Sequence, residues 1–471
     1  MSSLCTSNLP DANAAKSSAT PSETRSLLRL ATPIAAIALV SMGMSVTDAA
    51  MVARLFGPEA LAAVAVGSDL YSILYYFGAG ILSGLAPFYT AAIVRANIAE
   101  RVRLQRIGQV SVLLVAAALA PIVWSAPDWL RPMGLDPALL DLGRGYTQAM
   151  ALTLLPMLGV VLYRTMLTAA ERPRVFLCVT LAMLPLNAWF NYLFMTGAGP
   201  MPALGITGAG ISSLLVAVAS LIVLAIISRT GKSAPQSVPF DWRGLMAVLK
   251  VGLPIGITAV AEVGVYLGTT IYAATLGTDD AAAHVLVLRV AGVAYAIPMA
   301  LLQAAMVRMA RAQTLADQQL QSRVIRTSLW LGIAGGFLSF AGLAVAAEPL
   351  ATTFLGADQI SAAAGLAIGL LILLGLIELF ENPCLAAAGL LRGRKDTLAP
   401  MLFTLAGNWV IGAPLGIYLC EVNQMGITGI WIGLLVGMVV TTLLTLYRLA
   451  QAQTGPELSV PRAIRFSRQT T

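Results

Sequence analysis

Residues 205–228 read GITGAGISSLLVAVASLIVLAIIS, a run without a single charged side chain. A bilayer core needs about 20 mostly apolar residues per helix, so this run is long enough to cross one. Lipid offers the backbone no hydrogen-bond partners, and a run this long and uniformly apolar does not alternate like a barrel strand. The stretch therefore predicts a transmembrane α-helix, and with it an all-α integral membrane protein.

Similar apolar runs fill most of the 471-residue chain, which is 58% hydrophobic and 11% charged. Such a composition lies far outside the range of soluble domains. With residues 205–228, the runs predict about twelve transmembrane helices; the others cover 27–53, 60–92, 107–126, 143–169, 175–197, 248–276, 281–307, 327–347, 360–390, 398–420 and 426–450.

The net charge of +7 comes from basic residues in alternate short connections between these runs. Cytoplasmic connections carry the excess of Lys and Arg, so a membrane orientation explains the charge better than nucleic-acid binding. We expect a multi-pass protein of the bacterial inner membrane with both termini in the cytoplasm. The basic set includes Arg95, Arg101, Arg103, Arg106, Arg172, Arg308, Arg311, Arg392, Arg394 and Lys395, whereas the opposite connections hold only Arg54, Arg131 and Arg144.

The chain also repeats itself at a fixed offset. Gly-Ile-Thr-Gly occurs at 205–208 and at 426–429, and Pro33 with Pro254, like Asn187 with Asn408, keeps the same separation. Six spans per copy, an even number, place both copies in one orientation, which predicts two pseudo-symmetric six-helix bundles. The expected segments are an N-terminal tail (1–26), an N-terminal lobe (27–228), an inter-lobe linker (229–247), a C-terminal lobe (248–450) and a C-terminal tail (451–471).

Soluble-enzyme motifs are absent from the sequence. It has no phosphate-binding Gly-Lys-Ser/Thr loop and no His-Glu-x-x-His, and its four cysteines are not spaced as zinc ligands. We expect neither an enzyme nor a cofactor, and an ion gradient rather than ATP as the energy source. A membrane-embedded enzyme would need a clustered nucleophile and base or a metal triad, which the sequence does not show.

Glu262 is the strongest candidate for a functional charge, because apolar residues flank it near the middle of its span. A charge inside a span costs at least about 2.5 kcal/mol, so it must face protein or water. A carboxylate there can exchange a proton or a cation during transport, or serve as a protonated packing residue.

Glu378 and Glu381 lie three residues apart on one span, with Pro383 shortly after. Two carboxylates on one helix face favour a shared proton or a bound Na⁺, and Pro383 frees backbone carbonyls as further ligands. A structural kink with one protonated Glu is the alternative.

Asp48 lies late in the first span, and Asn187 and Asn191 lie four residues apart on the fifth. The two amides can hydrogen-bond a carboxylate or a substrate, although polar helix packing also explains them. For Asp48 itself, exposure at an interface is the alternative.

Other polar residues in spans carry weaker predictions. Asp69 and Arg164 are near enough to span ends to snorkel into the interface. His284, the only histidine, can titrate, but a satisfied structural imidazole is the simpler interpretation.

At these residues the chain resembles the multidrug and toxic compound extrusion family, in its NorM-type bacterial branch. The resemblance spans nearly the whole chain and rests on VTDAAMVARLFG at 46–57, ALAAV at 60–64, LNAWFN at 186–191, GLP at 252–254 with Glu262, AAH at 282–284 and LRGRKD at 391–396.

The resemblance implies two six-helix bundles around a central cleft, and Na⁺- or H⁺-driven export of cationic or amphipathic organic compounds. It relates Asp48, Asn187 and Asn191 to a proton site in the N-terminal lobe, and Glu262 and Glu381 to cation ligands in the other. Glu381 stands where relatives often have Asp, Ile377 where some have Tyr, and Val285 and Arg289 where Gln and Asn are common.

A lipid-linked saccharide flippase of the same broad superfamily is the rival interpretation, to which Arg164 and Arg289 give weight as cations for anionic headgroups. Under either hypothesis the partners are small substrates and membrane lipids. Two lobes in one chain need no second subunit, so we expect a functional monomer.

Overall fold

The structure, a computed structural model, describes residues 22–198, 202–228, 240–355 and 362–454. All regular elements within these ranges are helices. They are α1 (Glu23–Ser83), α2 (Ala86–Val94), α3 (Ile98–Trp124), α4 (Ala126–Leu130), η2 (Arg131–Met133), α5 (Pro137–Ala169), α6 (Pro173–Thr196), α7 (Ile206–Ile227), α8 (Trp242–Leu276), α9 (Thr278–Ala294), α10 (Ala296–Thr314), α11 (Gln318–Leu355), α12 (Ala362–Gly393), α13 (Leu398–Thr404), η3 (Leu405–Gly412), α14 (Ala413–Glu421) and α15 (Gly426–Thr454).

Eleven helical stretches in the described ranges are long and apolar enough to cross a membrane, and the first of them, Glu23–Val94, has 72 residues. At 1.5 Å per residue it would measure about 108 Å, more than three bilayer cores. Gly57 divides it, because its backbone (φ 85°, ψ −178°) is not helical and Pro58 follows. The break gives two spans and confirms the predicted architecture of about twelve.

A single glycine makes the same turn in each half of the molecule. Gly57 connects the first two spans, and Gly277 (φ 135°) connects α8 to α9 at the corresponding place in the second half. Both φ values lie in the region that favours glycine, since a side chain would be strained there. The separation of these two glycines is within one position of that between Pro33 and Pro254, which supports the repeat seen in the sequence.

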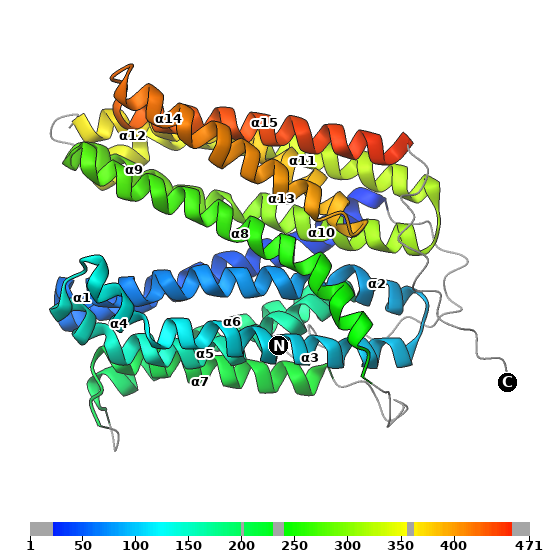
Figure 1. The fold of residues 1–471 in the computed structure, drawn as a ribbon, viewed down its shortest axis with the longest axis horizontal. Helices are drawn as coiled ribbons and strands as arrows, with labels where there is room; N and C mark the ends of the chain where they lie inside the picture. The colour runs from blue at the N-terminus through cyan, green and yellow to red at the C-terminus, as the bar shows by residue number, and fades with distance from the viewer. Residues whose placement is uncertain (1–21, 199–201, 229–239, 356–361, 455–471) are drawn as a thin grey trace.

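The helices form two lobes. Figure 1 shows most of α1–α7 in one layer and most of α8–α15 in the other, with the first parts of α1 and α8 crossing between the layers. Each lobe has its own apolar core, one built around residues such as Leu154 and Leu158, the other around residues such as Leu370 and Trp431. The two-bundle fold is as predicted.

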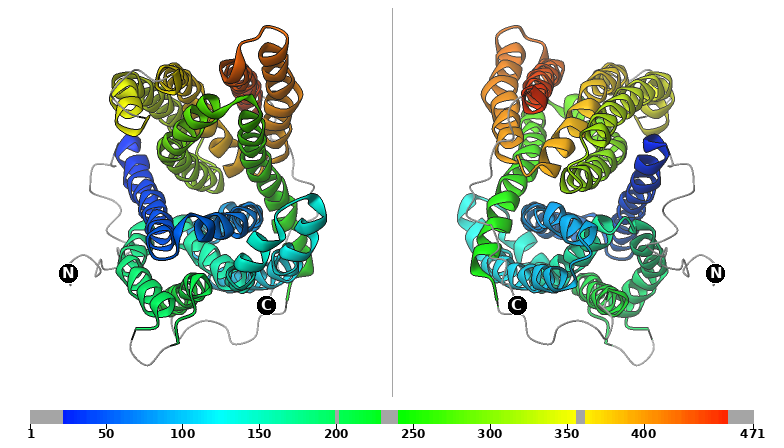
Figure 2. Two further views of the ribbon diagram at one scale, coloured as in Figure 1. Left: turned by 90° about the vertical axis from the view of Figure 1, so that its left-hand side faces the viewer. Right: turned by 90° about the vertical axis from the view of Figure 1, so that its right-hand side faces the viewer.

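The first helix of each lobe begins against the other lobe, an arrangement we call the reciprocal crossing. In α1, Leu27 and Leu30 pack with Ala304 and Val307 of α10, and Figure 2 shows these first turns beside the C-terminal layer. In α8, Val248, which stands at the repeat position of Leu27, is buried in the core of the N-terminal lobe. The exchange ties the two lobes together.

Close glycine packing joins the lobes where α1 meets α8. A Cβ added to Gly80 would lie 2.6 Å from Gly256 Cα, and one added to Gly84 would lie 2.6 Å from Gly252 Cα. Real Cβ atoms essentially never come so near, so only glycine permits this approach. Small residues four apart on facing helices are typical of tight transmembrane helix contacts.

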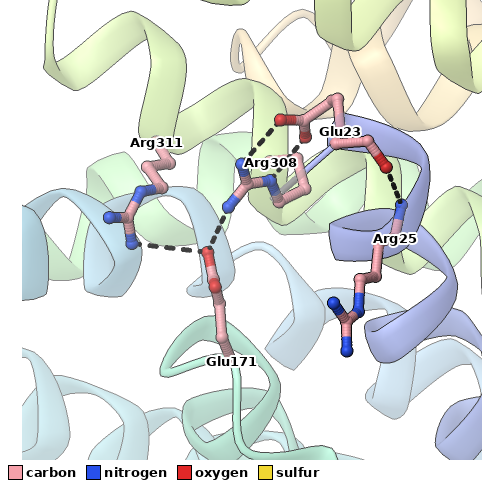
Figure 3. A network of polar contacts seen from close by, with 6 residues as sticks. Glu23, Arg25, Glu171, Arg308 and Arg311 are labelled. Atoms are coloured by element: carbon pink, nitrogen blue, oxygen red, sulfur yellow. Dashed lines mark hydrogen bonds and ion pairs between the residues drawn. The ribbon is translucent and has the colours of Figure 1, made fainter. Parts of the chain in front are cut away.

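An ion-pair network holds the lobes together near this crossing (Figure 3). The Arg308 guanidinium donates from Nε and Nη2 to both carboxylate oxygens of Glu23, at 2.7 and 2.8 Å, and from Nη1 to Glu171 at 2.9 Å. Arg311 also donates to Glu171, at 3.4 Å. Bidentate Arg–carboxylate geometry is among the strongest polar pairings, so we call these four residues the latch.

The latch lies at the end of the bundle that carries the connections after α2, α5, α10 and α12, which we call the basic end. Lys395 in the last of these connections places Nζ 4.0 Å from the ring centroid of Phe88 in α2, a further contact between lobes. Burial and the neighbouring charge of Arg95 both lower the pKa of Lys395.

Three helices extend a few residues beyond the predicted bounds of the lobes. The N-terminal tail was expected to reach residue 26, but α1 begins at Glu23, where the Ser22 side chain accepts from the Arg25 amide. The linker was expected to reach 247, but Asp241 caps α8 and the helix starts at Trp242. Likewise α15 continues to Thr454, past the predicted end of the lobe at 450. Most of the predicted tails, and linker residues 229–239, lie outside the described residues.

Candidate functional site

The N-terminal lobe gathers three of the predicted residues into one cluster. Asp48 comes from α1, while Asn187 and Asn191 present their amides from successive turns of α6. Asn187 Nδ2 donates to Asp48 Oδ1 at 2.6 Å, and Asn191 Nδ2 donates to the same oxygen. Asp48 therefore points at protein groups and is not simply exposed at an interface.

The cluster keeps one acceptor unsatisfied. Asn187 and Asn191 are 2% and 0% exposed, and Asn191 Oδ1 has no hydrogen-bond partner among the described residues. A buried polar atom without a partner is costly, typically about 1–3 kcal/mol. A carboxylate beside an unpaired amide oxygen is a donor set that suits a proton or a hard monovalent cation.

The C-terminal lobe holds a small cavity between α8, α12, the α13–η3 segment and α15. Glu262 and Glu381, two of the predicted residues, line it together with oxygen-bearing side chains and Arg392. Its volume of about 20 Å³ has room for roughly one water molecule or one dehydrated ion. An organic substrate does not fit, so the cavity is an ion-sized site; the other polar lining residues are Thr404, Asn408, Thr441 and Thr445.

A π-helical stretch shapes one wall of this cavity. In η3 the wider turn places Asn408 on the lining, and Trp409 Nε1 donates to the carbonyl oxygen of Ala261 at 3.0 Å. π-Turns within α-helices are rare and occur often at functional sites. This hydrogen bond holds η3, and with it α13 and α14, against α8 at Ala261, the residue before Glu262.

Two groups act directly on Glu262. Tyr295 Oη donates to Glu262 Oε2 at 3.2 Å, and the guanidinium of Arg392 interacts with Glu262 electrostatically. Arg392 was predicted to lie in a basic connection, but it lies in the last turn of α12 and is 7% exposed. Tyr295 was also missed. The signal that could have found this wall was Asn408, the repeat partner of Asn187.

Glu378 does not line the cavity that Glu381 enters. It is 1% exposed, and its carboxylate accepts from Asn382 Nδ2 at 2.8 Å on its own helix. Across the described residues, no three His, Cys, Asp or Glu side chains form a group able to hold a metal ion. A cation would therefore rest on two carboxylates with amide and hydroxyl oxygens.

The remaining charged residues in spans are not among the hydrogen-bond partners of Asp48, although Asp48 and Asp69 both interact electrostatically with Tyr146. Asp69 on α1 and Arg289 on α9 are exposed and interact electrostatically across the two lobes, and Arg164 is half-buried on α5. None of the three lines the cavity.

His284 is fully buried and hydrogen-bonded on both ring nitrogens. Trp431 Nε1 donates to Nδ1 at 3.1 Å, and Nε2 lies 3.2 Å from Thr270 Oγ1. The Thr270 hydroxyl itself donates to the Tyr266 carbonyl, so its oxygen accepts from Nε2. The neutral ring with its proton on Nε2 satisfies every contact, which supports the structural interpretation of His284.

The sequence profile of the MatE family matches twice, over residues 33–193 and 254–418. The chain belongs to the MatE family. The two matches begin at Pro33 and Pro254, the same pair of prolines that marks the sequence repeat, so the profile finds the duplication that the glycine turns also indicate.

Proteins named probable multidrug resistance protein NorM are similar along most of the MatE chain. Those of Mesorhizobium japonicum and Agrobacterium fabrum are each 30% identical, covering 90% and 88% of this chain and 93% and 90% of their own. The Rhodopseudomonas palustris protein is 31% identical over 92% of this chain and 93% of its own.

Solved MATE structures share the fold. A eukaryotic MATE transporter superposes with a TM-score of 0.81 at 19% identity, covering 91% of this chain and 95% of its own. A MATE protein in a bent conformation gives a TM-score of 0.82 at 15% identity, covering 92% and 95%. The chain is thus a multi-pass membrane protein of a multidrug efflux transporter family.

Proposed function

We propose that this protein exports small cationic or amphipathic organic molecules in exchange for Na⁺ or H⁺. The observation that carries the proposal is the pair of half-buried to buried carboxylate sites, one in each lobe. The Asp48 cluster offers an unpaired amide oxygen, and the Glu262–Glu381 cavity is too small for an organic molecule. Both suit an ion better than a drug.

Alternating access supplies the mechanism. The latch, the Phe88–Lys395 contact and the glycine crossing join the lobes at the basic end. With that end in the cytoplasm, the described state is closed to the cytoplasm. Protonation or Na⁺ binding at the carboxylates would shift the balance between this state and one closed at the other end, since a ligand favours the state it binds more tightly.

The positive-inside rule supports the orientation, with both termini in the cytoplasm of a bacterial cell. A single chain holds both ion sites, which supports a working monomer. Membrane lipids surround it, and no nucleic acid or cofactor takes part in the proposed cycle.

The test is efflux of a fluorescent organic cation from energised vesicles under imposed Na⁺ or H⁺ gradients. We expect one gradient to drive efflux, and Glu262→Gln to abolish the coupled part. Glu348→Gln, which removes an exposed carboxylate from α11, is the matched control and should keep the wild-type rate. If no gradient drives efflux of any cation tested, the antiport proposal fails.

A lipid-linked saccharide flippase is the second candidate. The exposed guanidinium of Arg289 favours it, because such a group pairs well with anionic headgroups. Flipping of a fluorescent lipid-linked sugar in proteoliposomes, without dye efflux, would select this function.

A further inference from the structure

The side chain of Arg392 stands out because it is a buried cation in the wall of a site proposed to bind cations. It lies in the last turn of α12, is 7% exposed, and lines the cavity with Glu262 and Glu381. A mobile cation and a fixed guanidinium compete for the same carboxylates. Arg392 therefore affects how many coupling ions the cavity can bind.

The charges of the cavity can be counted. Two carboxylates and one guanidinium line it, so with all three ionised its net charge is −1. A buried charge without a partner is very costly, and opposite charges beside it offset part of that cost. One monovalent cation, either Na⁺ or H⁺, brings the cavity to neutrality.

We propose that Arg392 is the permanent counter-ion of Glu262 and limits the cavity to one exchangeable cation per cycle. The inference rests on the proposed antiport and adds the number of charges that this cavity takes. Tyr295 and Arg392 act on the same carboxylate, because the Tyr295 hydroxyl donates to Glu262 Oε2 at 3.2 Å and the Arg392 guanidinium interacts with Glu262 electrostatically. Glu381 is then left for the mobile cation.

If Arg392 had only a structural role, the number of charges moved per substrate would not depend on it. A basic side chain in the last turn of a helix also interacts favourably with the carbonyl end of the helix dipole. Arg394, two residues later, provides the matched control. It donates to the Ala452 carbonyl at 2.6 Å and to Gln321 at 3.3 Å, away from the cavity.

The decisive measurement is the charge moved per substrate in proteoliposomes, with ethidium as the monovalent probe and the membrane potential clamped by K⁺ and valinomycin. The potential at which net ethidium flux vanishes gives the charge count. We expect Arg392→Gln to raise that count by one, and Arg392→Lys and Arg394→Gln to leave it at the wild-type value. An unchanged count in an active Arg392→Gln protein overturns the proposal.

Thermal unfolding in detergent tests the same pairing without transport. Arg392→Gln should lower the melting temperature, and Glu262→Gln/Arg392→Gln should recover part of the loss because it restores the charge balance. The pairing is refuted if the double variant loses as much as the two single variants together. Should no gradient drive efflux of ethidium or of any other cation tested, the antiport proposal fails, while the melting temperatures of these variants still decide whether Glu262 and Arg392 are paired.

Discussion

Residues of the same type in this protein have different surroundings. Asp48 and Asp69 both lie on α1, but Asp48 accepts two amide hydrogen bonds whereas Asp69 is exposed. The same contrast separates Glu381, which lines the cavity, from Glu378, which is held by Asn382. Local partners therefore distinguish the carboxylates that we propose to exchange an ion from those that we do not.

Asp48→Asn should lower gradient-driven dye efflux at least tenfold and leave the fold intact. The new amide can still accept from Asn187, and its NH₂ group finds the unpaired Asn191 Oδ1. Initial efflux rates in vesicles and melting temperatures measure the two effects. Asp69→Asn is the control at an exposed position, and equal rates in both variants would contradict the role of the cluster.

His284→Phe should destabilise the protein by about 1–3 kcal/mol, because the buried Trp431 N–H loses its acceptor. The pH profile of transport should not change, since the wild-type ring stays neutral. Trp431→Phe combined with His284→Phe should cost less than the two separate losses. A shifted pH profile would instead make His284 part of the proton path.

At the scale of helices, much could be predicted from sequence and some could not. Hydropathy located the spans because a bilayer requires long apolar runs, as residues 205–228 illustrate. Hydropathy could not show that Arg392 belongs to the helix and not to the connection after it. A basic residue at a span end gives the same pattern whether its side chain reaches the interface or lines a cavity. The π-turn of η3 likewise depends on packing against Ala261, which no local pattern records.

Alanine at Gly80 or Gly256 should force the lobes apart at the basic end, because each new Cβ would meet backbone atoms within 2.6–2.7 Å. Alanine at Gly43 or Gly268, on the same two helices, should have no such effect, since nothing lies within 4 Å of a Cβ there.

Spin labels at the exposed positions Ile98 and Leu398, in a background without native cysteines, measure this separation. We expect a longer mean distance for the Gly80 and Gly256 variants. Identical distance distributions in all four variants would show that the crossing does not set the closure.

The whole molecule depends on contacts made at one end. Arg308 joins Glu23 at the start of the chain's first helix to Glu171 in the connection after α5, so one side chain bridges three segments. Its side chain is 10% exposed, which protects the pairing from solvent screening. Closure of the basic end is therefore both apolar and ionic.

Arg308→Gln should open the basic end, because removing one partner of a buried ion pair costs about 3–5 kcal/mol. The same label pair should report a larger fraction of long distances. Arg131→Gln, which breaks the exposed pair with Asp141 at the opposite end, is the control and should leave the distances unchanged. An equal response in both variants would mean that general destabilisation explains the opening.

The reciprocal crossing also constrains how the protein is made. The ribosome completes the N-terminal lobe first, so Glu23 and Leu27 emerge long before Arg308 and Ala304, their partners. Until then the first turns of α1 have no helix of the other lobe to pack against. The N-terminal lobe also lacks the segment of α8 that fills its core. Neither half should mature alone, whereas two halves divided between residues 228 and 240 and expressed together should assemble into one transporter.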